Sequence, residues 1–450
     1  MEPTVRVRAR VPGVVSAAVE SVGPLGRRAV VARIDPKHRH GALAEADSET
    51  LAAAARLALD VRLPLVGLIA SSGADIDDGV GALHGWGLAA RGLAACSGVV
   101  PILLAVVGPA VSGPALLLGM ADVVVMGQTA LAYVSGPEMV AQMTGLRLGP
   151  GQLGGSGIHA RATGVAALDA DDSEAALDLL AETLDYLPDH TDAEAAAHDV
   201  GDSPERAAPE LTTLVPSSPS GSYDIRTVIG AVADGGGFLE LRSTWAPQLV
   251  TALARLDGRS VGFIANQPGV MAGTLDIAAS QKGARFVAFC DTFNLPIVTL
   301  VDTPGFMPGK DLEWRGMIRH GAQLVFAFAE ATVPRVSVIL RKGYGGAYIV
   351  MDSKRLGNDL CLAWPSAEVA VMGAEPAAQV LHRRSEPETR AQAVDDFRDA
   401  FLNPYVAAER GYVDEVIDPA ETRSAIARAL RLLAPKRERL PARKHGNTPL

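Results

Sequence analysis

The sequence is poor in cysteine and has no long apolar run. Only three of its 450 residues are cysteines, at Cys96, Cys290 and Cys361, and no two of them form a CxxC pair. Such spacing supports neither a disulfide framework nor a zinc ribbon, so we expect a protein of the reducing cytoplasm that holds no metal. No stretch reaches the roughly 18 consecutive apolar residues of a membrane span, and none near the N-terminus resembles a signal peptide. We therefore expect neither membrane insertion nor secretion.

Charge is also scarce. Charged residues make up 20% of the chain and hydrophobic residues 48%, values that are typical of a globular protein. The net charge of −10 is spread along the chain, whereas a nucleic-acid partner would require clustered Lys and Arg to displace counterions. We expect no nucleic-acid partner, and the length leaves room for two or three domains.

The first half alternates short apolar runs with segments rich in Ala and Leu. A strand is expected at residues 28–34, followed by a helix over residues 48–59 that is capped by Asp47 or Ser48. The alternation continues with strands at 65–69, 100–107 and 121–126 and helices at 83–93 and 114–119. Strands that alternate with helices predict an α/β fold with a mainly parallel sheet.

The second half repeats the first. Pro296 matches Pro64 and Pro334 matches Pro101 within similar apolar strands, with offsets of 296 − 64 = 232 and 334 − 101 = 233. Two further segments also repeat: residues 261–265 resemble the first strand, and residues 369–373 resemble residues 123–127. A nearly constant offset over most of a domain predicts two homologous domains in tandem.

Domain boundaries follow from a change in composition. Residues 206–222 are rich in Pro, Ser and Thr, as expected of a linker. We therefore expect an N-terminal domain at residues 1–205 and a C-terminal domain at residues 223–450.

A Gly-rich turn follows a corresponding strand in each half. Residues 333–340 form a β-branched run that leads into a turn with Gly346 and Ala347, and the first half has Ser112 and Gly113 at the corresponding place. Small residues let backbone N–H groups approach a ligand oxygen, so each turn is a candidate oxyanion hole. Two such turns suggest a cleft between the domains that polarises one oxygen on each side.

Several motifs occur in an order typical of one family. They include Asn266-Gln267-Pro268, Gly273-Thr274-Leu275-Asp276, Lys282-Gly283-Ala284-Arg285, Val301-Asp302-Thr303-Pro304-Gly305-Phe306, Gly316-Met317-Ile318-Arg319-His320, Trp364-Pro365-Ser366-Ala367-Glu368 and Lys444-His445-Gly446-Asn447. With these motifs the chain resembles the carboxyltransferase (β) subunits of biotin-dependent acyl-CoA carboxylases, of the propionyl-CoA type. The first half resembles the family's N-terminal domain through shorter motifs such as Ser135-Gly136-Pro137-Glu138.

The resemblance implies a fold and an activity. The fold would be two tandem crotonase/ClpP-like ββα superhelix domains, usually assembled as a homohexamer. Carboxybiotin on a biotin carboxylase/biotin carboxyl carrier (α) subunit would donate carboxylate to the α-carbon of an acyl-CoA at a dimer interface, without a side-chain base. Two alternatives remain: a decarboxylase or a carboxyltransferase acting on a carrier-protein thioester, or a non-catalytic assembly subunit.

The resemblance also implies roles for individual residues. Gly346 and Ala347 would donate backbone N–H groups towards biotin, and Ser112 and Gly113 would face the thioester oxygen. Residues expected to line the substrate sites are Gly73, Ala74, Pro304, Gly305, Phe306, Tyr344, Gly345, Tyr348 and Ile349.

Three positions depart from the family pattern. Pro114 matches Ala347 by offset (347 − 233 = 114), so a second donor is missing there because proline has no N–H. Asp75 stands where the family has Arg, which should weaken CoA binding. Ile349 stands where many propionyl-type members have Asp, and an apolar pocket floor would suit a longer or more varied acyl chain. We also expect the chain to lack the family's basic N-terminal helix that helps to hold CoA.

Overall fold

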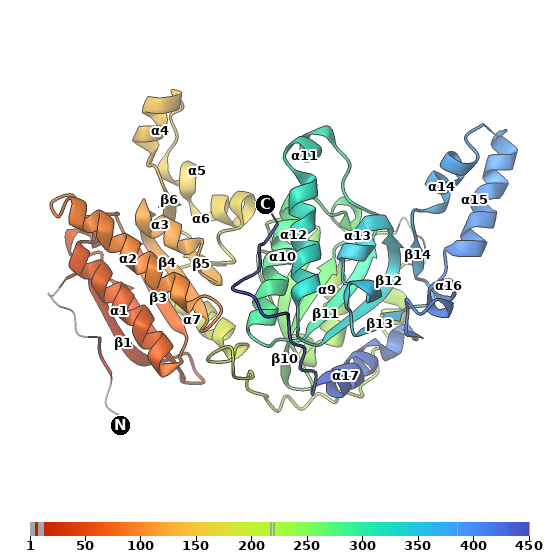
Figure 1. Ribbon diagram of the computed structural model, residues 1–450, viewed down its shortest axis with the longest axis horizontal. Coiled ribbons are helices and arrows are strands. Elements are labelled where there is room, and N and C mark those ends of the chain that lie inside the picture. Colours follow the sequence, from red (N-terminus) through yellow and green to blue (C-terminus); the bar gives the residue numbers. More distant parts are fainter. Residues whose placement is uncertain (1–4, 8–12, 217, 219–220, 385, 450) are drawn as a thin grey trace. The chain divides into compact units, whose positions relative to one another are not determined.

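The computed structural model describes residues 5–7, 13–216, 218, 221–384 and 386–449, which form two compact units (Figure 1). The first unit comprises Met1–Ala196, Arg242–Trp245 and Thr292–Asn294, and the second comprises Ala197–Leu241, Ala246–Asp291 and Leu295–Leu450, in each case for the described residues. The expected linker at residues 206–222 falls within the second unit, where Leu211 is buried, and its residues 217, 219 and 220 lie outside the described residues.

The first unit is built on a seven-stranded sheet in the order β1-β2-β3-β4-β5-β7, with β6 paired to the end of β4. The strands are β1 (Val15–Val22), β2 (Arg27–Ile34), β3 (Leu65–Ser71), β4 (Ile102–Val111), β5 (Val123–Gly127), β6 (Leu131–Tyr133) and β7 (Leu168–Ala170). Only β1 and β2 are antiparallel among these pairs. The predicted mainly parallel sheet is therefore confirmed for this unit.

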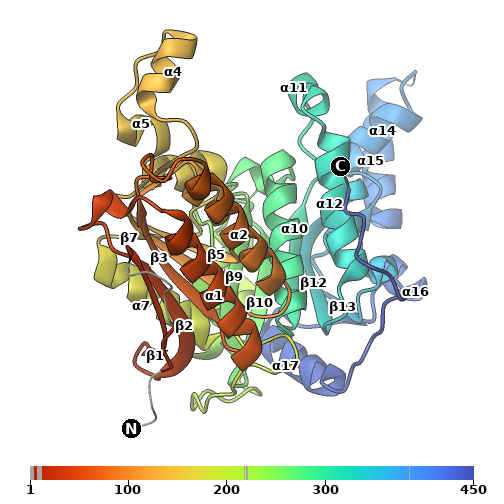
Figure 2. The same cartoon turned by 60° about the vertical axis from the view of Figure 1, so that its left-hand side comes forward.

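Helices cover both faces of this sheet. They are α1 (Glu45–Val61), α2 (Val80–Cys96), α3 (Gly113–Leu118), α4 (Pro137–Thr144), α5 (Pro150–Gly154), α6 (Ser156–Ile158) and α7 (Ser173–Asp185). Helices α1 and α2 pack side by side on one face, and α7 lies on the other (Figure 2). In β4, Ile102 and Leu104 join the cluster formed with α1, while Leu103 between them is equally buried. A strand that is buried on both faces reads as a continuous apolar run, which is why β4 was recognisable from the sequence.

The start of α1 differs from the prediction. The helix begins earlier than expected, and its N-cap is Ala44 rather than Asp47 or Ser48. Asp47 lies within the first turn, where its carboxylate accepts the N–H of Ala44 at 3.1 Å and that of Val14 at 2.7 Å. The same carboxylate pairs with Nη2 of Arg39 at 3.0 Å. Asp47 is therefore a buried anchor between the helix and the strand β1.

Replacing Asp47 with alanine should destabilise the first unit. The amides of Ala44 and Val14 would lose a buried acceptor, so we expect the free energy of unfolding to fall by about 3 kcal/mol. Urea unfolding followed by circular dichroism measures the change. The control is Asp60→Ala on the same helix, since Asp60 is exposed near the C-terminus, where a carboxylate is unfavourable to the helix dipole. Equal unfolding midpoints for the two variants would contradict the anchoring role.

The second unit has an eight-stranded sheet in the order β15-β13-β12-β11-β10-β9-β8, with β14 paired to the end of β12. Its strands are β8 (Phe238–Glu240), β9 (Leu249–Leu256), β10 (Arg259–Asn266), β11 (Ile297–Thr303), β12 (Arg335–Tyr344), β13 (Leu360–Ala363), β14 (Glu368–Ala370) and β15 (Glu415–Val416). Strands β8, β9 and β10 are antiparallel to one another in turn, and the remaining pairs are parallel.

Helices surround this second sheet as well. They are α8 (Leu211–Leu214), α9 (Ile225–Val232), α10 (Ile277–Thr292), α11 (Lys310–Trp314), α12 (Met317–Glu330), α13 (Gly345–Val350), α14 (Ala374–Leu381), α15 (Pro387–Phe401), α16 (Pro404–Glu409) and α17 (Thr422–Leu433). The central core packs α9 and α17 against β9 to β13 and includes the buried Trp364. Helices α14 and α15 lie side by side beyond this core (Figure 1).

The two sheets repeat one another in register. In the first, Val30 pairs with Leu65 across β2 and β3, and in the second, Gly262 pairs with Ile297 across β10 and β11. Both residues of the pair are displaced by the same offset, since 262 − 30 = 232 and 297 − 65 = 232. The duplication predicted from the sequence is thus confirmed at the level of strand pairing.

One of the four sequence matches was wrong. Residues 369–373 were expected to repeat residues 123–127, but the structure assigns these segments to different positions. β14 pairs with the end of β12, as β6 pairs with the end of β4, whereas β13 pairs with the middle of β12, as β5 pairs with β4. β14 is therefore the counterpart of β6, and β13 is the counterpart of β5. Short Val-rich runs resemble one another too closely to be assigned without their partners.

No helix in the described part of the chain combines the length and the apolar character needed to cross a membrane.

Candidate active site

The turn after β12 presents backbone N–H groups. Gly345 follows the last residue of this strand with φ of +59°, a conformation that glycine adopts without steric cost. A Cβ at Gly345 would lie 3.0 Å from the carbonyl oxygen of Val371, so a larger residue would be crowded. The helix α13 begins here, and the first N–H groups of a helix have no acceptor within it. The amides of Gly346 and Ala347 lie in this first turn, so they have no acceptor within the helix.

An aromatic side chain lies beside this turn. A Cβ placed on Gly346 would lie 3.6 Å from Cε2 of Phe306. Gly305 has φ of +147°, and its carbonyl accepts the N–H of Leu275 at 3.2 Å, which fixes the loop that carries Phe306. The structure thus brings together the predicted Gly346 turn and the predicted loop of Pro304, Gly305 and Phe306.

The first unit has a matching turn after β4. The pairing of Pro109 with Leu131 corresponds to that of Lys342 with Glu368, so the offset of 233 (342 − 109) extends to the turn. Ser112 has φ of +60° and ψ of −122°, close to the φ of Gly345, which confirms that these two residues correspond. Within this unit, a Cβ on Gly73 would lie 3.8 Å from Cβ of Ser112, and Ala74 forms a bridge with Leu43.

The two turns differ in the donors they offer. Because Ser112 matches Gly345, Pro114 occupies the position of Ala347 and supplies no N–H. Gly113 is buried, and a Cβ on it would lie 2.9 Å from Cγ of Trp86 on α2, whereas Gly346 is exposed. The sequence analysis missed Trp86, because its place in an expected helix did not indicate which turn that helix would cover.

The comparison with known families decides the identity. Residues 16–448 match the family described as Carboxyl transferase domain. The chain belongs to the carboxyl transferase family. The motifs indicated a resemblance to carboxyltransferases of the propionyl-CoA carboxylase type. The relatives confirm it, since they include carboxyltransferase subunits of propionyl-CoA carboxylases.

Two relatives and one solved structure illustrate the similarity. The carboxyltransferase is 45% identical over 444 residues to the propionyl-CoA carboxylase beta chain of Saccharopolyspora erythraea, covering 94% of this chain and 81% of that protein. It is 42% identical over 435 residues to the methylmalonyl-CoA carboxyltransferase 12S subunit of Propionibacterium freudenreichii subsp. shermanii, covering 94% and 82%. The crystal structure of transcarboxylase 12S with methylmalonyl-coenzyme A and methylmalonic acid bound has a TM-score of 0.97 and 39% identity, covering 100% and 90%. The expected tandem crotonase-like fold is thereby confirmed.

Asp75 of the carboxyltransferase does not present an anion to solvent. Its side chain is only 11% exposed and pairs with Nη1 of Arg39, while Oδ1 accepts the N–H of Asp77 at 3.1 Å. Arg39 also pairs with Asp47, so its one positive charge is shared between two buried carboxylates. Asp75 is therefore held in an ion pair within the unit, and the expected weakening of CoA binding stays a prediction.

Two of the expected substrate residues point into the protein. Tyr344 is buried against Ala374 and Leu402 and donates its hydroxyl to Glu368, and burial raises the pKa of its phenol. Tyr348 is also buried, and burial is again the main cause of its raised pKa. Both rings are therefore held within the unit, and the expected role of these two residues in lining a substrate site stays a prediction.

Ile349 is not the floor of a buried pocket within its unit. It is 46% exposed on the outer side of α13, and its counterpart Leu116 (349 − 233 = 116) is 48% exposed on α3. The expected place of Ile349 on the floor of an acyl pocket stays a prediction, and within this unit alone the side chain is exposed.

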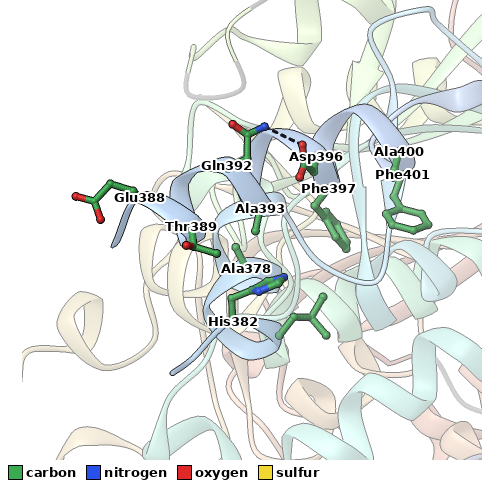
Figure 3. A pocket seen from close by; sticks show the side chains of 11 residues that line it. Ala378, His382, Glu388, Thr389, Gln392, Ala393, Asp396, Phe397, Ala400 and Phe401 are labelled. Carbon is green, nitrogen blue, oxygen red and sulfur yellow. Dashed lines mark hydrogen bonds between the residues drawn. The ribbon is translucent and has the colours of Figure 1, made fainter. Parts of the chain in front are cut away.

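A cavity of the carboxyltransferase lies away from the turn. It has a volume of about 700 Å³ and lies between α14 and α15 (Figure 3). Its lining includes Ala378, Phe397 and Phe401, and none of the predicted site residues belongs to it. The predicted site residues therefore lie outside this cavity.

Proposed function

We propose that this chain is the carboxyltransferase subunit of a biotin-dependent acyl-CoA carboxylase and transfers carboxylate from carboxybiotin to the α-carbon of an acyl-CoA. The observation that carries the proposal is the amide pair of Gly346 and Ala347 at the start of α13, with Phe306 beside it. The fold similarity to transcarboxylase 12S, crystallised with methylmalonyl-coenzyme A, supports the acyl-CoA substrate.

The residues of the second unit fit a carrier-borne biotin. Carboxybiotin, when bound, supplies the carboxylate and, after losing it, a basic ureido nitrogen. The amides of Gly346 and Ala347 would stabilise the negative charge that develops on the ureido oxygen, because preorganised donors need no reorientation during the reaction. The ring of Phe306 would exclude water from one side of this oxygen.

The first unit would hold the acyl thioester. Loss of a proton next to a thioester places negative charge on its oxygen, and the amide of Gly113 is the backbone donor that the turn retains. Gly73 and Ala74 would form the adjacent wall. A site with one amide donor would stabilise this charge less than one with two, which makes the first-unit turn the weaker half of the proposed machinery.

We also assign partners to this proposal. The biotin would be carried by a biotin carboxylase/biotin carboxyl carrier (α) subunit, and the chain would form a homohexamer in which turns from different copies cooperate. Support for self-association comes from transcarboxylase 12S, whose structure is described as a hexamer assembly. We place this action in the reducing cytoplasm, because the sequence has only three cysteines and no CxxC pair.

A decarboxylase is the second candidate. Methylmalonyl-CoA decarboxylase subunit alpha of Veillonella parvula is 41% identical over 411 residues, covering 91% of this chain and 80% of that protein. Such an enzyme would use the same two turns for the reverse reaction, the removal of carboxylate from a carboxyacyl-CoA.

The test combines the purified chain with a biotinylated partner, ATP, labelled bicarbonate and acyl thioesters. We expect labelled carboxyacyl-CoA that disappears when avidin sequesters biotin. Acyl-CoAs of increasing length report the acyl preference, and acyl carrier-protein thioesters form a parallel series. Product formed only from the carrier-protein series would replace the proposed substrate, and no product from any short or medium acyl-CoA would refute the main proposal. Decarboxylation of a carboxyacyl-CoA without labelled product would favour the second candidate.

A further inference from the structure

A buried ion pair lies at the base of the second-unit turn. Asp302, near the end of β11, is fully buried, and its Oδ2 accepts Nε–H of Arg341 at 3.0 Å. Oδ1 of the same carboxylate accepts the backbone N–H of Lys342 at 3.2 Å. Lys342 and Gly343 lead directly to Tyr344 and the turn, so this carboxylate holds the strand just before the proposed biotin-side donors.

A third donor completes the shell of this carboxylate. The hydroxyl of Tyr223 donates to Oδ2 of Asp302 at 2.9 Å, and its ring lies 5.2 Å from Cζ of Arg341. Burial and the neighbouring carboxylate raise the pKa of Tyr223, so its phenol stays neutral and keeps its proton for this bond. Asp302 thus receives donors from two segments that are distant in sequence, the end of β12 and the chain before α9.

Arg341 extends the network to another segment. Its Nη1 donates to the carbonyl oxygens of Ser218 and Gly221, each at 2.8 Å, and lies 3.4 Å from that of Pro216. A buried guanidinium group requires hydrogen-bond acceptors for its N–H donors, and Nη1 of Arg341 finds them in backbone carbonyls. The arginine therefore fastens the chain before α9 to the strand that delivers the turn.

The first unit shows that the fold does not need this network. The β3 and β4 ladder shifts register between Ile69 and Ser71, as the β11 and β12 ladder shifts between Val301 and Thr303. The residue inside the first shift is Ala70, which matches Asp302 (302 − 232 = 70).

The arginine has an equally small counterpart. Gly108 matches Arg341 (341 − 233 = 108), and a Cβ on Gly108 would lie 3.0 Å from Cβ of Ala70. The same irregularity is therefore built once from Ala and Gly and once from a buried ion pair. Since a buried ion pair carries a desolvation penalty, its presence only at the second turn calls for a role beyond folding.

We propose that Asp302, held by Arg341 and Tyr223, is a positioning residue. It fixes the backbone from Lys342 to Ala347 in the conformation that binds carboxybiotin. The expected effect on carboxyl transfer rests on the proposed function. The expected effect on the conformation of the turn does not. Asp302 touches no reacting atom and acts through the amide of Lys342. Loss of the acceptor would let the turn sample positions in which the amides of Gly346 and Ala347 no longer converge on one oxygen.

A second buried ion pair in the same unit provides a matched control. Asp234 accepts Nη2 of Arg423 at 2.7 Å and the N–H of Gly258 at 2.8 Å, and Arg423 also donates to the carbonyl of Ser203 at 3.1 Å. Both side chains are buried, as in the first pair. Gly258 lies before the start of β10, at the end of the parallel strands opposite to the turn that follows β12.

The test compares Asp302→Asn with Asp234→Asn in the full chain. Asparagine keeps the volume but turns one acceptor into a donor, so either Lys342 or the pair of Arg341 and Tyr223 loses its bond. Hydrogen exchange read by mass spectrometry should rise roughly tenfold or more in peptides covering 342–347 for Asp302→Asn only. Peptides covering 112–118 should stay unchanged in both variants.

Kinetics supply the second readout. With free biotin as the acceptor and a carboxyacyl-CoA as the donor, Asp302→Asn should lower kcat by roughly tenfold to a hundredfold while the KM of the CoA substrate stays the same. Asp234→Asn should retain the parental kcat even where its thermal stability falls. Equal exchange at 342–347 in the two variants, or a kcat that follows stability in both, would overturn the inference.

Failure of the proposed function can be distinguished from failure of the positioning role. If the parental chain transfers no carboxylate, the proposed function fails, and the exchange comparison alone decides the positioning role. If Asp302→Asn does not fold, Tyr223→Phe removes one donor and leaves the ion pair in place. Increased exchange at 342–347 in that variant supports the inference, and unchanged exchange overturns it.

Discussion

Replacing Ala347 with proline is expected to lower the rate of carboxyl transfer by about 100- to 1,000-fold, the usual effect of removing one oxyanion-hole donor. Proline deletes the N–H that Ala347 would direct at the ureido oxygen. The local fold should accept the ring, because the first unit has Gly113 and Pro114 in the positions of Gly346 and Ala347. The measurement is carboxyl transfer at saturating acyl-CoA, together with the thermal unfolding temperature.

The matched control for this variant is Ala347→Gly. It keeps the N–H and removes only a buried methyl group, so it should cost about 1 kcal/mol of stability and little activity. Proline and glycine variants with the same rate would show that the amide of Ala347 takes no part in the reaction. That result would favour the non-catalytic assembly subunit.

Replacing Pro114 with alanine is expected to have the second largest effect, a gain. It would restore an N–H at the position where the second unit has Ala347, so the first turn could donate twice to the thioester oxygen. We expect transfer to acyl-CoA to become roughly tenfold faster, a fraction of the full value of one donor because Trp86 covers the neighbouring Gly113. Single-turnover transfer from carboxybiotin to acyl-CoA measures the chemical step directly.

Pro109→Ala controls for the general effect of losing a proline. Pro109 lies in β4, the strand before the turn, at the position of Lys342. Its substitution changes chain entropy without adding a donor to the turn. An unchanged rate in Pro114→Ala would mean that the thioester oxygen is not held at this amide.

The internal repeat was the most informative signal in the sequence. The two proline pairs gave offsets of 232 and 233 residues. The second offset correctly aligned Pro114 with Ala347 before any strand pairing was known. The match of residues 369–373 to 123–127 failed because both runs are short and rich in Val, and their register depends on long-range pairing. Sequence similarity was reliable where a residue with special backbone properties marked the position.

Side-chain direction was the least predictable property. Tyr344 and Tyr348 stand next to the Gly-rich turn in sequence, yet both rings are buried, and Ile349 beside them is exposed. The compensation of Asp75 by Arg39 was equally hidden, because it joins two loops that are far apart in sequence. The sequence did contain a sign of one buried ion pair. Arg341 stands within the apolar strand of residues 335–344, where an arginine requires a buried partner, and Asp302 is that partner.

The burial of Tyr344 has a mechanical consequence. Its ring packs against Ala374 of α14 and against Leu402, which follows α15, while its backbone is bonded directly to Gly345. The ring of Tyr344 therefore connects α14 and the end of α15 to the turn. A molecule that separates these helices would displace Tyr344, which is one residue from the amide donors. Binding at the surface of α14 and α15 would then change the conformation of the turn without direct contact.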